Sequence, residues 1–320
     1  MTTYKEIKGT QIEVLSSDPS NPLDGQVWFN STDNVLRGNV GTPVVAWSTV
    51  NSLNKARTST SGAGIATAAL VVGGYSTTNI ADTESWNGSN WTEVNNLNTA
   101  RSSTGSMGTY TAALTFGGSG SPSYLSNTET WNGSNWTEVN DLNSARRALP
   151  GAGTNTAGLA IGGFEPPGTN KVESWNGTNW TETTDLNTPR YASAGAGIQT
   201  AALLIGGAGG TPKTELWNGS NWTEVNDLNQ GREALMGSGV QTSAVAYGGT
   251  TPAGAATESW NGTNWTEVND LNNGRIRAAS AGATNTSALA SGGVPAPGSP
   301  SNVAFAEQFA GLTTKTFTDS

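Results

Sequence analysis

A six-residue string, Trp-Asn-Gly-(Ser/Thr)-Asn-Trp, recurs along the chain and restricts its fold more than any other feature. The copies occupy residues 86–91, 131–136, 175–180, 217–222 and 260–265, and they contain ten of the twelve tryptophans. Asn-Gly favours a tight turn, and Trp, Thr and Val favour extended backbone, so each copy predicts a β-hairpin. A turn over 87–90 makes Trp86 face Trp91, and Glu84 face Glu93. Burial of a tryptophan pair contributes several kcal/mol at about 25 cal/mol per Å², whereas exposed charge pairs contribute less than about 1 kcal/mol, so the aromatic contact is expected to set the register.

The hairpins belong to a longer tandem unit that begins after a recurring arginine. The string Leu-Asn-x-(Ala/Pro/Gly)-Arg ends at Arg57, Arg101, Arg146, Arg190, Arg232 and Arg275, with spacings of 44, 45, 44, 42 and 43 residues. An apolar run follows each arginine and ends in Gly-Gly, from Gly73-Gly74 to Gly292-Gly293. Six units of this length, each with four short strand candidates, predict an all-β, six-bladed β-propeller.

Within a unit, the strands differ in composition. Small residues such as those at 193–197 suit an innermost strand, where the blades crowd around the axis. The apolar run at 200–205 is long enough to be a strand buried on both faces between neighbouring blades. The hairpin then supplies the third and fourth strands.

The two ends of the array indicate how the ring closes. Residues 47–54 align without gaps on 91–98, so the array begins with an isolated fourth strand, and the last unit has no second tryptophan near Phe309. We expect strand 43–50 to complete the sixth blade. The alternative is that Lys315–Thr318 supplies that strand after a short insertion. The expected organisation is an N-terminal β-hairpin segment at 1–42, with short strands at 25–30 and 34–38 around a Ser-Thr-Asp turn, a propeller at 43–311, and a C-terminal strand or tail at 312–320.

Composition excludes several classes of function. The 320 residues include no His and no Cys, so the chain has no imidazole base, no thiolate nucleophile, and no His or Cys ligand for a metal. A net charge of −9 argues against binding nucleic acid through its phosphates. No apolar run approaches the roughly 18 residues that span a bilayer, and Met1 is not followed by the hydrophobic region of a secretion signal. No cofactor, metal, nucleic acid or membrane insertion is therefore expected.

The order of arginine, apolar strand, Gly-Gly and a spaced aromatic pair resembles the kelch repeat over residues 43–311. This resemblance implies a propeller that binds proteins or glycans. It departs from kelch units at Trp86 and its equivalents, where tyrosine is more common. Some kelch propellers are copper oxidases, but their His and Cys-linked Tyr have no counterpart here.

The N-terminal segment brings a second resemblance. Asp18-Pro-Ser-Asn-Pro22, Gly25-Gln-Val-Trp-Phe-Asn30 and Val35-Leu-Arg-Gly38 are similar to the leader of tail-fibre and virion-surface proteins of tailed bacteriophages that infect marine bacteria. This similarity implies a virion component made in the host cytoplasm, with other virion proteins as partners. Other copies of the same chain, in a homo-oligomer, are the alternative partners. The similarity to phage proteins also implies that residues 1–42 attach the propeller to the particle. The expected attachment residues are Trp28, Phe29, Leu36 and Arg37.

The repeated carboxylates, such as Glu84 with Glu93, could be interpreted as the acid pair of a glycosidase. Their recurrence in every full hairpin favours a structural role instead, either facing solvent or in a repeated ion-pair ladder with the Arg57 series. On this interpretation, alanine at Arg146 lowers stability modestly. The tyrosines occupy unrelated positions in their units, which disfavours a sialidase-type nucleophile, and we expect no enzymatic activity.

The repeats diverge most between Gly-Gly and the hairpin, and in a four-stranded blade these connections share one face. The aromatic and basic residues expected to bind a ligand there are Tyr75, Tyr124, Phe164, Lys171 and Lys213. Together with these loops, the resemblance to phage proteins implies a non-enzymatic phage protein, either a tail fibre or a surface decoration, that binds host glycan, host protein or a virion subunit. A microbial kelch scaffold outside any virus is the alternative, and a polysaccharide-active enzyme is the third interpretation.

Overall fold

The chain divides into two compact units, one of residues 1–45 with 311–320 and one of residues 46–310. The computed structural model describes residues 13–17, 27–32, 34–38, 45–250, 254–296 and 301–310. All regular elements in this part of the chain are β-strands. The alternative closing strand, Lys315–Thr318, lies outside the described residues.

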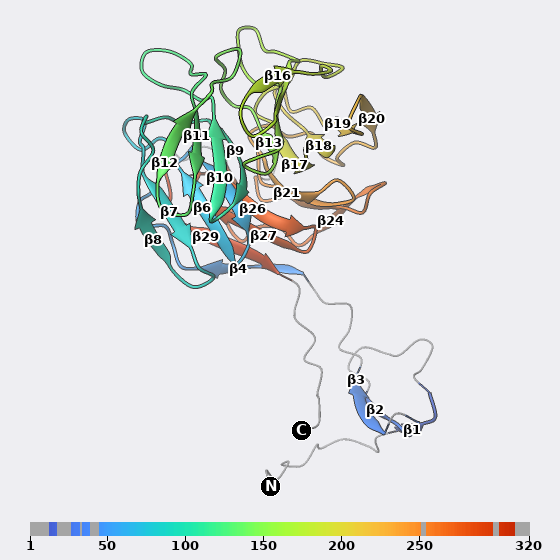
Figure 1. Ribbon diagram of the computed structural model, residues 1–320. Helices are drawn as coiled ribbons and strands as arrows, with labels where there is room; N and C mark the ends of the chain where they lie inside the picture. The colour runs from blue at the N-terminus through green and yellow to red at the C-terminus, as the bar shows by residue number, and fades with distance from the viewer. Residues whose placement is uncertain are drawn as a thin grey trace. The chain divides into compact units, whose positions relative to one another are not determined.

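The larger unit is a ring of six four-stranded antiparallel sheets, which confirms the predicted six-bladed propeller (Figure 1). Each blade contains, from the axis outward, the small-residue strand, the apolar strand and the two hairpin strands. Blade 1 contains β5 (Ser61–Ile65), β6 (Ala68–Val72), β7 (Thr83–Trp86) and β8 (Trp91–Val94). Blade 2 contains β9 (Gly105–Thr109), β10 (Ala112–Phe116), β11 (Thr128–Trp131) and β12 (Trp136–Val139). Blade 3 contains β13 (Gly151–Gly153), β14 (Gly158–Ile161), β15 (Val172–Trp175) and β16 (Trp180–Glu182).

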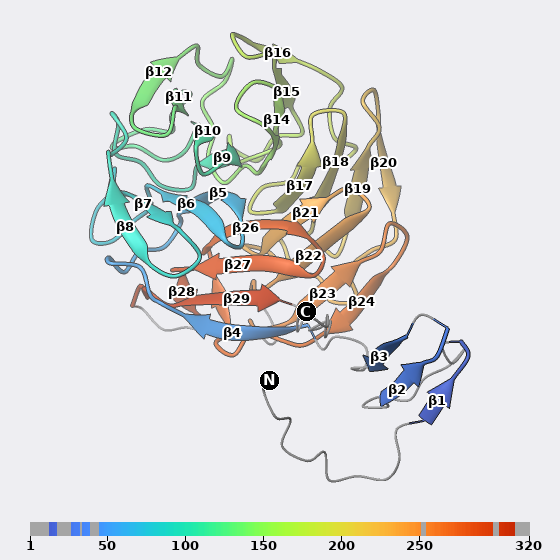
Figure 2. The same cartoon turned by 60° about the horizontal axis from the view of Figure 1, so that its bottom comes forward.

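The second half of the ring repeats this order. Blade 4 contains β17 (Ala194–Ile198), β18 (Ala201–Ile205), β19 (Thr214–Trp217) and β20 (Trp222–Val225). Blade 5 contains β21 (Met236–Val240), β22 (Ser243–Tyr247), β23 (Thr257–Trp260) and β24 (Trp265–Val268). Blade 6 contains β26 (Ala279–Thr284), β27 (Ser287–Ser291), β29 (Ala306–Ala310) and β4 (Ala46–Val50), and a two-stranded ribbon of β25 (Arg275–Ile276) and β28 (Val294–Pro295) lies beside it. Figure 2 shows the small-residue strands around the centre and the fourth strands at the outside.

The N-terminal strand closes the ring, as predicted. β4 pairs antiparallel with β29, with Ala46 opposite Ala310 and Trp47 opposite Phe309. The Trp47 ring lies 5.0 Å from that of Phe309 and 4.8 Å from that of Tyr247, measured between centroids. Strands from the two ends of the array therefore share one sheet and one aromatic contact.

The hairpin register follows the tryptophans. Trp86 lies opposite Trp91 and Glu84 opposite Glu93, and the two indole rings are 5.1 Å apart. The Asn87 side chain accepts hydrogen bonds from the backbone N–H groups of Ser89 and Asn90, which fixes the turn. Trp86 is almost fully buried and donates its indole N–H to the carbonyl of Ala66. Local turn chemistry and aromatic burial thus select the same pairing.

The hydrophobic core lies between blades rather than inside a single sheet. One cluster joins Val71 and Trp86 of blade 1 to Leu289 and Ala306 of blade 6, and each further cluster likewise joins neighbouring blades. Tryptophans of the fourth strands also bind across the boundary, as where the Trp136 indole donates to the Thr83 hydroxyl at 3.2 Å. A blade without its neighbour would expose this surface, so stability depends on a complete ring.

The smaller unit contains a three-stranded sheet of β1 (Glu13–Leu15), β2 (Val27–Asn30) and β3 (Val35–Gly38). The antiparallel pairing of β2 with β3 is the hairpin expected from the sequence. β1 pairs with β2 in parallel, and the sequence did not predict it.

An asparagine after the fourth strand forms a clamp to the next hairpin in most blades. Asn95 donates to the carbonyl of Ser134 at 3.0 Å and to the side chain of Asn135 at 2.8 Å, and Asn51, Asn140 and Asn226 make related bonds to the following blade. In blade 3 this position is Thr184, which is too short to reach the next hairpin in the same way.

We expect Thr184→Asn to add the missing clamp and to raise the free energy of unfolding by about 0.5 kcal/mol, the lower end for an exposed hydrogen bond. The reciprocal change Asn95→Thr should lower it by a similar amount. Urea denaturation of both variants checks this, and a destabilised Thr184→Asn variant would show that blade 3 meets blade 4 differently.

Candidate functional site

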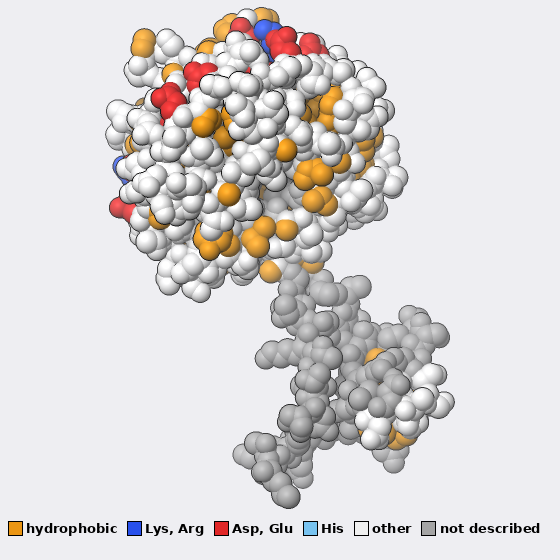
Figure 3. Space-filling model, viewed as in Figure 1, with side chains coloured by type: hydrophobic (Ala, Val, Ile, Leu, Met, Phe, Trp, Pro, Cys, Tyr) orange, Lys and Arg blue, Asp and Glu red, His pale blue; other side chains and the backbone are white. Residues whose placement is uncertain are grey.

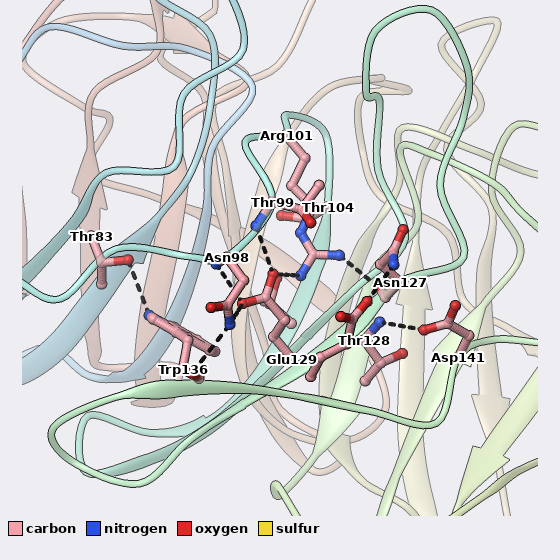
Figure 4. A network of polar contacts seen from close by, with 12 residues as sticks. Thr83, Asn98, Thr99, Arg101, Thr104, Asn127, Thr128, Glu129, Trp136 and Asp141 are labelled. Carbon is pink, nitrogen blue, oxygen red and sulfur yellow. Dashed lines mark hydrogen bonds and ion pairs between the residues drawn. The ribbon is translucent and has the colours of Figure 1, made fainter.

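A buried ion pair fixes each connection between neighbouring blades. In blade 2, Arg101 donates to the Glu129 carboxylate at 2.7 Å, and the backbone N–H groups of Asn98 and Thr99 bind the same carboxylate (Figure 4). The Asn98 side chain adds a further bond at 2.9 Å. Arg101 also donates to the carbonyl of Asn127, so the connection is tied to the third strand at several points. The same pair occurs six times, as Arg57–Glu84, Arg101–Glu129, Arg146–Glu173, Arg190–Glu215, Arg232–Glu258 and Arg275–Glu307.

Burial of these six ion pairs raises the stability cost that is expected when one partner is removed. The side chains of Arg146 and Glu173 are 0% and 1% exposed, so the pair does not face solvent. Burial lowers the pKa of the Arg101 guanidinium from its ordinary value, and the charge of Glu129 opposes that shift. Loss of one partner leaves an uncompensated buried charge, so the modest effect expected from the sequence for alanine at Arg146 is too small. The opposing acid of each hairpin, such as Glu93, is exposed.

The second residue after each repeat arginine lies close to the propeller axis. Residues Ser59, Ser103, Ala148, Ala192, Ala234 and Arg277 all have φ between 51° and 55°. The backbone N–H of each donates to the carbonyl of the equivalent residue in the preceding unit, at 2.7 to 3.0 Å, and the N–H of Ser59 donates to Arg277, which completes the circle. This ring of six hydrogen bonds holds the innermost strands together at one end of the axis. Non-glycine residues tolerate the left-handed region only where surrounding structure compensates for the strain.

The connections from the second to the third strand lie on the same face as this ring. Single bridges such as Thr58 with Tyr75 and Arg147 with Phe164 join the residue after the repeat arginine to the residue after Gly-Gly in four units. In the other two units, a backbone hydrogen bond or the β25–β28 pairing joins the same positions. We call this side the loop face. The close approach requires glycine at Gly73, where a Cβ would lie 2.6 Å from the carbonyl oxygen of Arg101.

A channel of about 510 Å³ runs along the axis between the innermost strands. Small residues and backbone line most of it, from Gly64 and its equivalents at one end to the loop face at the other. Arg147, Tyr191, Glu233 and Arg277 line the loop-face end, and we call these four residues the channel mouth. The volume falls within the range of small-molecule sites.

Aromatic side chains gather beside the channel mouth. The rings of Tyr124 and Phe164 meet edge to face at 5.9 Å, and those of Phe164 and Tyr191 at 4.8 Å, between centroids. The Arg147 guanidinium lies over both Tyr124 and Phe164, at 5.3 and 5.0 Å from the ring centroids. We call these four residues the aromatic cluster. The structure thus brings together two of the residues predicted to bind a ligand and adds Arg147 and Tyr191.

The other residues predicted for this face lie apart from the cluster. Tyr75 is 43% exposed, and its carbonyl accepts a hydrogen bond from Asn302 of blade 6. The Lys171 ammonium lies 3.9 Å from Glu165, and that of Lys213 lies 2.8 Å from Glu224. The hydrogen bond to Glu224 raises the pKa of Lys213. Both lysines therefore have a carboxylate partner.

Arg147 and Tyr191 were not predicted from the sequence, because each directly follows a repeat arginine and lies outside the variable connections between Gly-Gly and the hairpin. The available signal was variation at this position, which reads Thr58, Ser102, Arg147, Tyr191, Glu233 and Ile276 around the ring.

The residues expected to attach the N-terminal segment lie in β2 and β3. Trp28 is opposite Arg37 and Phe29 is opposite Leu36. Trp28 is buried and Phe29 half-buried, whereas the side chains of Leu36 and Arg37 lie outside the description.

Within the described ranges, no three Asp or Glu side chains gather as a metal-binding group would require. A search of the same residues for helices finds none that is long and apolar enough to cross a membrane.

Comparison with known proteins supports the fold. No model of a known protein family matches the sequence, and no curated protein sequence matches it significantly. Among solved structures, the chain is similar to one described as "Structure of YjhT", with a TM-score of 0.66 and 13% sequence identity over 80% of this chain and 95% of that one. The chain therefore has the six-bladed β-propeller fold, and an identity this low carries nothing about its activity.

Proposed function

We propose that this propeller is a kelch-type, non-enzymatic binding module of a tailed-phage particle, which presents its loop face to a glycan of the host surface. The observation that carries the proposal is the contrast between a scaffold repeated almost letter for letter and one face where the repeats differ. The aromatic cluster lies on that face, beside a channel large enough for a sugar residue. Aromatic faces and edges provide rigid apolar contact for saccharide rings at low entropic cost.

The carboxylates support a binding role over catalysis. Each acid of the Glu84 series lies against a repeat arginine, and Glu129 and its equivalents also accept backbone N–H groups. The oxygens of such a carboxylate already accept hydrogen bonds from the arginine and the backbone, so it is poorly placed to transfer a proton to a substrate. The third interpretation, a polysaccharide-active enzyme, therefore has less support than binding.

The virion assignment rests on the N-terminal resemblance. Residues 1–42 would attach the protein to other virion components through Trp28, Phe29, Leu36 and Arg37. Mass spectrometry of purified phage particles tests this assignment. We expect peptides from 43–311 among the structural proteins, whereas their absence from particles would favour the microbial scaffold.

For the binding role, we expect Tyr124→Ala and Phe164→Ala each to weaken glycan binding about tenfold, because each removes aromatic contact worth about 1 kcal/mol or more. Glycan-array screening followed by titration calorimetry measures the effect. Tyr110→Ala is the matched control, because Tyr110 is 45% exposed in the turn between β9 and β10, away from the loop face. Unchanged binding in both cluster variants would place recognition elsewhere, and release of reducing sugar would favour the enzyme.

A further inference from the structure

The propeller contains few arginine and lysine side chains, and nearly all of them have a carboxylate partner. Charged residues make up 12% of the whole chain, and they are sparse on the face shown in Figure 3. Six of the eight arginines between residues 46 and 310 form the buried ladder. The three lysines of the same span lie within 4.0 Å of Asp82, Glu165 and Glu224.

Arg147 and Arg277 are the two exceptions. Across the described part of the chain, neither has an Asp or Glu oxygen within the 4.0 Å of an ion pair. Both line the channel mouth. Arg147 enters from the connection to blade 3 and Arg277 from the connection to blade 6, so they approach the axis from opposite sides of the ring. In a chain of net charge −9, two unpaired guanidinium groups at one opening form a local positive site.

The surroundings of Arg147 keep its donors available. Its guanidinium carbon lies over the rings of Tyr124 and Phe164, at 5.3 and 5.0 Å from their centroids. A guanidinium has five N–H donors, so one that contacts aromatic rings still has N–H groups that can bind an oxyanion. Arg277 is exposed and lines the channel mouth from the opposite side of the ring.

Backbone N–H groups are not available to bind an anion at the channel mouth. The N–H groups that approach the axis there are used in the ring of six hydrogen bonds. Arginine side chains are therefore the charged donors that a ligand meets. Glu233 also lines the mouth and accepts a hydrogen bond from the Gly209 N–H at 2.8 Å, so its negative charge limits how much anionic charge the site tolerates.

From these contacts we infer that the channel mouth binds the anionic group of a glycan, a carboxylate or a sulfate ester, through Arg147 and Arg277. The sugar ring would then contact Tyr191 of the aromatic cluster. This inference rests on the proposed glycan-binding function and specifies its ligand class. A polyanion such as nucleic acid is disfavoured by Glu233 and by the acidic remainder of the chain.

The test uses immobilised oligosaccharides matched in backbone that end in a neutral sugar, a uronate or a sulfate ester. The full chain should bind one or both acidic probes at least about tenfold more tightly than the neutral one, with binding that weakens as salt rises. Arg147→Gln and Arg277→Gln should each remove most of this preference, and the double variant all of it. Lys55→Gln is the matched control, since it also removes one cation but from a pair with Asp82. Thermal unfolding checks that each variant is folded.

The outcomes separate this inference from the proposed function. Preference for the uronate over the sulfate, or the reverse, identifies which anion the site selects. Equal binding of all three probes that is sensitive to Tyr124→Ala would overturn the anionic ligand and keep glycan recognition. Acidic-probe binding that survives the double arginine variant would also overturn it. Binding to none of the probes would overturn both.

Discussion

Arg101→Ala is expected to lower the free energy of unfolding by about 3–5 kcal/mol, among the largest effects of any single substitution in the propeller. The substitution leaves the Glu129 carboxylate buried without its cation, because that side chain is only 1% exposed. The three N–H donors from Asn98 and Thr99 remain, but they neutralise only part of the charge. Denaturation with guanidinium chloride, followed by tryptophan fluorescence, measures the change.

A surface pair in the same chain provides the control for Arg101→Ala. Lys213 and Glu224 form an ion pair of nearly the same distance, 2.8 Å, but their side chains are 39% and 50% exposed. Because solvent screens such a pair, Lys213→Ala should change stability far less than Arg101→Ala does. Similar losses in the two variants would mean that burial does not govern the ladder.

The double variant Arg101→Met with Glu129→Leu tests the mechanism further. Removing both charges removes the unpaired carboxylate, so the double variant should recover much of the stability lost in Arg101→Ala. The N–H groups of Asn98 and Thr99 would lose their acceptor, so recovery should be incomplete. A double variant less stable than the single one would indicate that the ladder stabilises the fold through its hydrogen bonds more than through its charge.

Much of the fold could be predicted because local and tertiary signals agree in each repeat. At Trp86–Trp91, the Asn-Gly turn, the extended propensity of the flanking residues and aromatic burial all favour one register. The strand at Trp47 could be assigned to the last blade because its alignment with Trp91 continues through Arg57. Repetition turned weak signals into a reliable one, because each pattern recurred with the same spacing.

The ladder shows where sequence reasoning was less accurate. Glu84 and Glu93 have the same residue type and similar neighbours, and the sequence predicted that they face each other. The sequence could not show that Glu84 is fully buried and Glu93 exposed, because that depends on the strands of the next blade and on the connection that carries Arg57. The stability loss expected for removing a repeat arginine was therefore too small, even though its pairing with a glutamate was one of the alternatives predicted.

The channel mouth could not be predicted for a different reason. Ser59, Ala148 and Arg277 have no residue preference for positive φ, so nothing in the sequence indicates the hydrogen-bonded ring. Tyr124 and Arg147 come from different connections, which the hydrogen bond from the Arg146 N–H to the Leu125 carbonyl brings together. Variation between repeats identified the loop face, whereas the geometry within it required the structure.

Two matched N-terminal truncations test how the ring closes and should differ greatly in stability. Removing residues 1–42 leaves β4 in place, so the propeller should unfold at nearly the same denaturant concentration as the full chain. Removing residues 1–50 deletes β4, exposes the pairing edge of β29 and removes the Trp47 contacts with Phe309 and Tyr247. An unpaired strand edge beside a newly exposed aromatic surface promotes aggregation, so we expect this shorter chain to be largely insoluble.

A point substitution separates the aromatic contact from the strand itself. Trp47 is 5% exposed, and its indole N–H donates to the Thr257 hydroxyl of blade 5 at 3.1 Å. Trp47→Ala keeps the backbone of β4 and should lower the free energy of unfolding by about 3–5 kcal/mol, as for other buried aromatic side chains. Denaturation of a soluble variant measures this loss.

If the chain lacking residues 1–50 were instead soluble, monomeric and as stable as the full chain, another segment would have to supply the fourth strand of blade 6. Because β4 joins the first described residues of the propeller to its last strand, its loss should open the ring at one boundary and weaken all the inter-blade cores that depend on closure.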